Sequence, residues 1–164
     1  MLCGPSTSAQ HVFDESRLKA AFVFQFPQWT EWPARALEGR PTLEYCVWPP
    51  NPFGSALRDL VAGEVRGGRQ LVVRELTPTT PLSTCHVLFV PGPAARQVLG
   101  RVASQPVLTV GDSPRFLDEG GIVQLVRVGN HLRFNINVAA AQRAGLRLSS
   151  HLLGLAENLR RGSQ

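Results

Sequence analysis

The sequence predicts a three-layer α/β fold in which helices cover both faces of a mostly parallel sheet of about six strands. Short apolar segments alternate with helical segments along the chain, and this alternation is typical of parallel sheets. Near the C-terminal end, two β-rich segments are separated only by Gly129-Asn130, which favours an antiparallel hairpin because both residues tolerate positive φ. At 164 residues, with 43% hydrophobic and 18% charged residues, the chain has the size and composition of one folded domain.

The first predicted helix begins at Asp14 and carries apolar residues at helical spacing. Pro27 is expected to kink this helix, and Trp32-Pro33 is expected to end it. Its row of aromatic residues is interpreted as core packing, because a helix that lies on a sheet needs an apolar face. Residues 1–12 are expected to form a disordered leader remnant, which leaves a single α/β domain over residues 13–160.

The remaining predicted elements alternate in type. Strands are predicted over residues 43–48, 70–76, 85–90, 106–110, 122–128 and 132–138, and helices over 55–62, 94–102 and 138–144, followed by a last helix capped by Ser149 or Ser150. Together they define a Rossmann-like layout with the hairpin as an edge of the sheet. Residues 77–84 are short for a crossover, so either a tight helical turn fits there or the flanking strands are not both parallel. Asn137 is expected to cap the helix that Gly145 ends.

The formal net charge of +5 does not by itself indicate nucleic-acid binding. Sixteen of the seventeen basic residues are arginines, and they are scattered along the chain instead of clustered. The positive electrostatic field of such a chain is better suited to attracting an acidic protein or anionic headgroups. The sequence contains no run of the roughly 18 apolar residues needed to span a bilayer. The first ten residues lack the features of a secretory leader, so an exported protein is expected to have its leader peptide absent from this sequence.

No catalytic constellation stands out, and neither a cofactor, a metal ion nor an enzymatic activity is expected. The chain has no glycine-rich nucleotide loop after a strand, no Gly-x-Ser-x-Gly elbow and no paired Cys or His spacing for a metal. Asp112 follows a predicted strand where α/β folds bind ligands, and with the Gly120-Gly121 turn it forms a candidate ligand pocket. The competing interpretation is an ordinary turn in which Asp112 accepts backbone N–H groups. His86 is interpreted as a hydrogen-bonded structural residue.

Two cysteines lie in or beside predicted strands. If the strands of Cys46 and Cys85 are neighbours, about 4.8 Å apart, the separation suits a disulfide. If they are not, the two residues are buried free thiols. The residues alone leave both alternatives open.

The segment from the hairpin to the last helix offers side chains suited to protein contact. Arg133, Asn135 and Asn137 alternate with apolar residues on the second hairpin strand, so they share a polar face. Leu146 and Leu148 are apolar positions in a short connector, and a polar rim beside an apolar patch is typical of an interface. The competing interpretation places both leucines in the core. An exposed hairpin edge beside an apolar C-terminal surface also favours a homodimer.

Four sequence blocks occur in an order and spacing that resemble a known family. They are Lys19-Ala20-Ala21-Phe22 with Glu31-Trp32-Pro33, then Asn51-Pro52-Phe53-Gly54, then Cys85-His86-Val87-Leu88-Phe89-Val90, and finally Pro106-Val107-Leu108-Thr109-Val110-Gly111-Asp112 with the closing Gly145-Leu146-Arg147-Leu148-Ser149-Ser150. These blocks cover the chain from about Ser16 to Leu155. They resemble the YfiR-like family of periplasmic proteins that repress a membrane-bound diguanylate cyclase. The chain differs at Asn135, where the family usually has an acidic residue, and it lacks a further cysteine pair of some members.

The resemblance implies a non-catalytic periplasmic regulator that binds the sensor domain of a membrane diguanylate cyclase and represses cyclic di-GMP synthesis. It further implies that an outer-membrane lipoprotein or a change of redox state relieves the repression. An exported family also favours the disulfide between Cys46 and Cys85. The alternative function is a small-ligand-binding α/β module or weak enzyme that uses the candidate pocket at Asp112.

Overall fold

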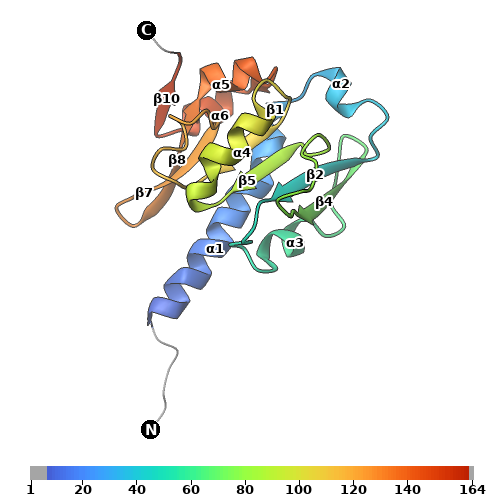
Figure 1. Cartoon of the computed structure of the whole chain (residues 1–164). Helices are drawn as coiled ribbons and strands as arrows, with labels where there is room; N and C mark the ends of the chain where they lie inside the picture. The colour runs from blue at the N-terminus through green and yellow to red at the C-terminus, as the bar shows by residue number, and fades with distance from the viewer. Residues whose placement is uncertain (1–6, 163–164) are drawn as a thin grey trace.

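The computed structural model describes residues 7–162, and it describes side chains from Asp14 onward (Figure 1). The helices are α1 (Thr7–Gln25), the 3-10 turn η1 (Phe26–Trp29), α2 (Ala34–Leu37), α3 (Ala56–Val61), the 3-10 turn η2 (Gly92–Ala94), α4 (Ala95–Val102), α5 (Val138–Arg143) and α6 (Ser150–Leu155). The main sheet contains β2 (Thr42–Val47), β3 (Val65–Arg66), β4 (Arg69–Glu75), β5 (Val87–Val90), β6 (Leu108–Gly111), β7 (Val123–Val128), β8 (His131–Asn137) and β10 (Asn158–Arg160). A separate ribbon pairs β1 (Thr30–Glu31) with β9 (Arg147–Leu148).

The main sheet has the order β10-β8-β7-β6-β5-β2-β4-β3. Strands β4, β2, β5, β6 and β7 are parallel neighbours, β8 is antiparallel to β7, and β3 is antiparallel to β4. This confirms the mostly parallel α/β sheet with a C-terminal antiparallel hairpin, although it has eight strands instead of about six. The two short strands β3 and β10 account for the difference.

The hairpin is not at the edge of the sheet, which corrects the expectation from the sequence. Strand β10 pairs parallel with β8 and covers its outer side, and the N–H of Glu157 donates to the carbonyl of Phe134 at 2.8 Å where this pairing starts. The short, polar stretch of β10 does not resemble a strand in sequence, so its pairing depends on α6 returning the chain to β8. Where β10 pairs with it, β8 therefore has no open outer edge through which a homodimer could form.

Two apolar cores lie on opposite faces of the sheet. One lies between the sheet and α1 with α3, and α5 and α6 contribute further buried residues to it. The other lies beneath α4 and includes Trp48, Leu88, Val98, Leu99 and Phe116. Figure 1 shows α4 in front of the sheet and α1 crossing behind it. Helices on both faces confirm the predicted three layers.

The first helix differs from its prediction at both ends. It begins at Thr7 instead of Asp14, so it includes half of the predicted leader, while residues 1–6 of that leader lie outside the described residues. Its α-helical part ends at Gln25, and a 3-10 turn continues the chain to Trp29. Pro27 is the cause, because a proline has no N–H to donate within a helix. The prediction of a kinked helix as far as Trp32 is wrong.

The connection between β4 and β5 resolves the difficulty of the short crossover. Both strands are parallel to β2, which lies between them, so the connection crosses one strand. It contains turns but no helix, and it buries Leu76, Leu82 and Cys85 on the α4 face. Neither expected solution is correct: a loop with its own apolar side chains makes the crossing.

A disulfide ties this loop to the sheet. The sulfur atoms of Cys46 in β2 and Cys85 are 2.06 Å apart, the Cα atoms are 5.8 Å apart, and the Cα atom of Cys46 lies opposite that of Leu88 in β5. Both cysteines are buried. The expected pairing is confirmed, and the alternative of two free thiols is wrong.

We expect the disulfide to stabilise the domain substantially. Its residues are 39 positions apart, and closing a loop of this length stabilises a protein by about 4 kcal/mol in the chain-entropy model. Replacing both cysteines by alanine should therefore lower the melting temperature by roughly 10 °C, and circular dichroism should still show the α/β fold. Recovery of two separately alkylated cysteine peptides from the non-reduced protein would contradict the pairing.

Candidate functional site

Asp112, at the carboxyl end of β6, is held by α1 and by the loop after β5. Its Oδ2 lies 3.0 Å from the ammonium of Lys19, and its Oδ1 accepts the N–H of Gly92 at 3.2 Å. Lys19 also lies 3.5 Å from Glu15, which pairs at 3.2 Å with Arg127 of β7. Both carboxylate oxygens of Asp112 are used within the protein, so this side chain anchors α1 to the sheet. This role differs from the local turn expected as the alternative, because the backbone N–H that Asp112 accepts belongs to Gly92, 20 residues away.

The predicted turn at Gly120-Gly121 has a packing function. A Cβ on Gly121 would lie 2.1 Å from the ring of Phe116, and a Cβ on Gly111 would lie 2.2 Å from the other side of that ring. The fully buried ring therefore fits between two glycines, where any side chain would collide with it. Gly120 has a φ of +99° and lines a cavity that Asp112 does not reach. The predicted pocket residues are thus not brought together.

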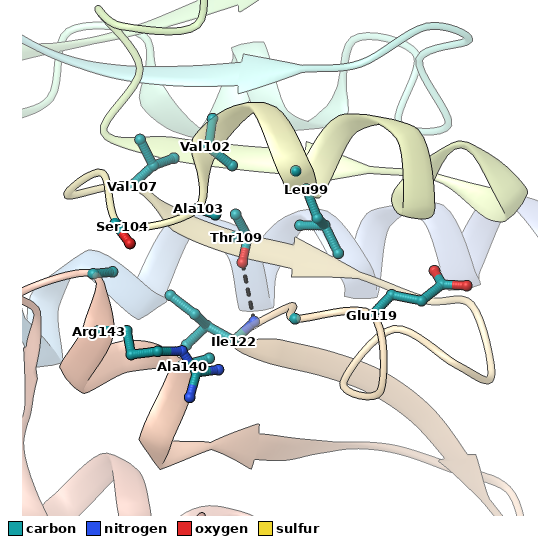
Figure 2. A pocket seen from close by; sticks show the side chains of 13 residues that line it. Leu99, Val102, Ala103, Ser104, Val107, Thr109, Glu119, Ile122, Ala140 and Arg143 are labelled. Atoms are coloured by element: carbon teal, nitrogen blue, oxygen red, sulfur yellow. Dashed lines mark hydrogen bonds between the residues drawn. The ribbon is translucent and has the colours of Figure 1, made fainter.

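The cavity beside Gly120 has a volume of about 140 Å³ and lies between α4 and α5 (Figure 2). Its apolar walls include Leu99, Val102, Val107 and Ala140. The hydroxyl of Thr109 accepts the N–H of Ile122 at 3.0 Å, so it is already used. Figure 2 shows Glu119 and Arg143 at opposite sides of the opening. The cavity can accept a small apolar group, but it offers no paired acid and base.

Asn135 forms part of a ladder of amides across three strands. Its Nδ2 donates to the Oε1 of Gln124 in β7, and its Oδ1 accepts from the Nδ2 of Asn158 in β10, both at 3.2 Å. Gln124 in turn donates to the carbonyls of Ser113 and Pro114 at 2.8 and 3.0 Å. These bonds fix the β6–β7 loop and the C-terminal strand on the hairpin. Asn135 is therefore mainly a structural residue.

Asn137 is buried and does not reach the surface. It caps α5, as predicted, by accepting the N–H of Ala140 at 3.0 Å, and it donates to the carbonyl of Leu117 at 3.3 Å. Arg133, earlier on the same strand, is exposed. Of the three side chains expected to form a polar face for a partner, Arg133 alone is fully available to one.

The two leucines of the connector have different environments. Leu146 is 5% exposed and belongs to the core, as its competing interpretation held, so it is not part of a contact surface. Leu148 is only partly buried and lies in β9, against β1. Arg133 lies near the start of β8, close to the hairpin turn, whereas Leu148 lies beyond α5, which begins at the other end of β8. The expected single surface is therefore two separate regions.

Leu148 lies on a concave region that we call the Trp29 surface, formed by Trp29, Glu31, Arg147 and Leu148. Its cavity of about 300 Å³ is lined by residues from η1, β1, β9 and the start of α6. The rings of Trp29 and His151 are stacked at a tilt, with their centroids 5.1 Å apart. Glu31 and Arg147 are exposed on paired strands of the small ribbon. An aromatic and apolar floor with charged edges is the usual composition of a protein contact site.

The sequence placed Trp29 in the core-facing aromatic row of the first helix, and the half-buried side chain does pack against the core. It also lines this cavity, which the spacing did not predict. The available signal was Pro27, which ends the α-helical part of the segment before Trp29. The N–H of Ser149 donates to the carbonyl of Trp29 at 2.9 Å and brings the C-terminal connector to this point. Ser149 also caps α6, as predicted.

His86 is a buried structural residue, which confirms its interpretation. Its Nδ1 accepts the N–H of Glu44 at 3.0 Å, and its Nε2 lies 3.0 Å from the carbonyl of Ala36, so the proton is on Nε2. Burial lowers the pKa of His86 below its ordinary value of 6.5, and the nearby cations of Arg40 and Arg69 act in the same direction. The neutral ring joins β2 and β5 to α2.

The fold and these surfaces define a mixed α/β domain whose exposed sites are suited to binding. Among the described residues, no group of three His, Cys, Asp or Glu side chains is placed to hold a metal ion. The chain belongs to the YfiR/HmsC-like family, whose model matches residues 16–157. The family as a whole is associated with periplasmic regulation of cyclic di-GMP signalling. Within residues 7–162, no helix has the length and apolar character to cross a membrane.

Comparison with solved structures supports the fold. The crystal structure of a conserved domain protein from Vibrio cholerae O1 biovar El Tor str. N16961 aligns with a TM-score of 0.52 and 12% sequence identity. The alignment covers 88% of this chain and 60% of that chain, so this chain spans less than two thirds of its length. At this identity the likeness concerns the fold alone. No curated protein matches the chain significantly in sequence.

The position of Phe116 predicts a strong effect of Gly121→Ala. The added methyl group must displace a buried ring or the backbone, so we expect a loss of about 1–3 kcal/mol in the free energy of unfolding. Gly100→Ala is the matched control, because its Cβ meets no atom within 4 Å on the exposed side of α4. Urea unfolding should show Gly100→Ala to be as stable as the parent or more so. Equal stability of both variants would contradict this packing.

The environment of His86 predicts a specific pH dependence of stability. Because the folded protein keeps the ring neutral, the unfolded chain binds more protons as the pH falls below 6.5. The contribution of His86 to stability should therefore be complete above pH 6.5 and decrease as the pH falls towards the lowered pKa. Melting temperatures between pH 7.5 and 5 should fall more steeply for the parent than for His86→Gln, which cannot titrate. Parallel curves would show that His86 does not titrate differently in the two states.

Proposed function

We propose that this protein binds the periplasmic sensor domain of a membrane-bound diguanylate cyclase and thereby represses cyclic di-GMP synthesis. The Trp29 surface carries this proposal, because it combines a partly exposed tryptophan, a leucine and an arginine in one concave region. Tryptophan and arginine are enriched among the residues that dominate binding energy at protein interfaces. Family membership supplies the class of partner.

The charge of the protein supports an acidic partner surface. The Trp29 surface itself carries one charge of each sign, Arg147 and its cross-strand neighbour Glu31, whereas the net charge of the whole protein is +5. A positive field of this kind raises the rate of encounter with a negatively charged domain and orients the encounter. The apolar floor then provides the part of the affinity that does not depend on salt.

The protein acts in this proposal by binding and not by chemistry. The two side chains considered above as a ligand group and a structural histidine have partners within the protein: Asp112 is bonded to Lys19 and Gly92, and His86 is bonded on both ring nitrogens. A general acid or base needs a proton-transfer partner within hydrogen-bond reach. These groups have no such freedom while the fold is intact.

Repression is relieved when an outer-membrane lipoprotein binds the regulator or when its disulfide is reduced. Reduction would free the β4–β5 loop from β2, because the bond between Cys46 and Cys85 is the covalent link between them. A homodimer remains part of the proposal, but β10 covers the hairpin edge that first supported it. Its contact would have to use another surface.

A small-ligand-binding module is the alternative function, and one observation favours it. The cavity of about 140 Å³ between α4 and α5 has apolar walls, and Gly100 and Gly120 are among its lining residues. It is smaller than the roughly 300 Å³ at which pockets for drug-sized ligands begin. A ligand there would be a small apolar molecule.

The Trp29 surface predicts the effect of two substitutions on binding. Leu148→Asp places a charge on the apolar floor, and Arg147→Glu reverses the charge at its edge, so each should weaken binding to the sensor domain at least tenfold. Calorimetric titration of the purified sensor domain measures the affinity. Arg147 is exposed, so its substitution should leave the melting temperature within about 1 °C of the parent.

Matched controls separate lost contact from lost stability. Leu60→Asp makes the same change on α3, where the leucine is 37% exposed, and Arg96→Glu makes the same reversal on exposed α4. Both controls should bind as the parent does. If folded Leu148→Asp and Arg147→Glu bind with unchanged affinity, the partner uses another surface. A sensor domain that fails to bind the parent protein would overturn the proposed function itself.

A further inference from the structure

A third cavity, of about 170 Å³, opens at the amino-terminal ends of β5 and β6. It is separate from the Trp29 surface and from the cavity of Figure 2, because it shares no residue with the former and only Val107 with the latter. The segments that meet there are α2 with its following turn, the β4–β5 loop and the residues before β6. Their polar side chains are Arg35, Arg40, Ser83, His86 and Gln105.

The charged side chains that line this cavity are all of one sign. Arg35 and Arg40 line it, and none of the described residues in its lining is acidic. Arg40 donates one hydrogen bond, from Nη2 to the carbonyl of Ser83 at 3.3 Å. Arg35 makes no hydrogen bond or ion pair with the described residues. The guanidinium of Arg40 therefore lies at this cavity with unused N–H donors. The exposed side chain of Arg35, whose Nη2 lies on the side of Gly145, has no bond to the described part of the chain that prevents it from turning towards a ligand in the cavity.

The framework that carries Arg40 is held in place by a further arginine. Arg69 donates from Nε to the carbonyl of Arg40 at 3.1 Å and from Nη2 to the carbonyl of Leu37 at 2.8 Å. His86 donates to the carbonyl of Ala36, in the same turn of chain. These bonds fix the backbone on one side of the cavity before any ligand arrives. A site arranged in advance loses less conformational entropy when it binds.

The positive potential of the cavity reaches the ring of His86. Burial is the largest cause of its lowered pKa, but Arg40 and Arg69 lower it further, while the carboxylate of Glu44 acts in the opposite direction. Glu44 offsets only part of this positive charge, because its Oε1 is paired with Arg74 at 2.9 Å. An added negative charge beside Arg40 would therefore be favourable.

We propose that this cavity is a binding site for a small ligand that carries an oxyanion, either a carboxylate or a phosphate group. The forks of Arg35 and Arg40 hold the oxyanion, because guanidinium groups match the geometry of carboxylate and phosphate oxygens. Ser83 and Gln105 lie where they contact the remainder of the ligand. The volume limits that remainder to a few atoms. The site is independent of the proposed cyclase contact.

Titration with inorganic phosphate and, separately, with acetate tests this site. Chloride at matched ionic strength provides the reference for salt effects. The melting temperature should rise with saturation, and NMR of the imidazole of His86 should show its pKa rising as the bound anion offsets the charge of Arg40. A response to one oxyanion and not to the other identifies the group. Absence of a saturable response to both overturns the proposal.

Variants locate the response. Arg35→Gln and Arg40→Gln should each weaken anion binding at least tenfold, and Arg40→Lys should weaken it less, because it keeps the charge but loses the fork. Arg96→Gln on exposed α4 is the control and should bind as the parent does. A saturable response that survives in the Arg35→Gln/Arg40→Gln double variant also overturns the proposal. Neither result affects the cyclase contact, which Arg147→Glu tests.

Discussion

The close contact of Phe116 with two glycines is the constraint on which the C-terminal half of the domain depends. The ring occupies the space that side chains at Gly111 and Gly121 would fill, so it holds the start and the end of the β6–β7 loop together. Strands β6 and β7 are therefore parallel neighbours without a helix between them. The hydroxyl of Thr109 accepting the N–H of Ile122 completes this junction. The hairpin, the caps and β10 all follow from the position that β7 acquires there.

This arrangement also decides which polar side chains remain available for binding. The loop held by Phe116 presents carbonyl groups to Gln124 and Asn137, and these amides become internal crosslinks. Asn135 is used in the same network. The amide side chains that make the hairpin look polar in sequence are thus engaged in hydrogen bonds within the protein. Side chains that remain available to a partner or a ligand lie where the chain changes direction, at the end of α1 and around α2.

Much of the fold could be predicted because its parallel strands are apolar on both sides. The runs that become β5 and β6 are entirely buried, which a continuous apolar segment between turn residues indicates. The helix caps at Asn137 and Ser149 follow from local chemistry and were also predictable. Strand β10 could not be predicted, because it forms only when the folded chain returns to pair with β8. Similarly, the spacing of Leu146 and Leu148 does not predict which of the two is buried in the core. The ribbon of β1 and β9 that orients this segment forms only in the folded protein.

The anchoring of α1 by a lysine has a practical consequence. Sixteen of the basic residues are arginines, so Lys19 is the one side-chain amine in the chain. Its side chain is only 17% exposed, because it lies between α1 and the carboxyl end of β6. Reagents that modify amines would therefore find a single, shielded target in the side chains, and the speed of its labelling would measure how often α1 separates from the sheet. The amine of Lys19 would thus report the opening of the contact between α1 and the sheet.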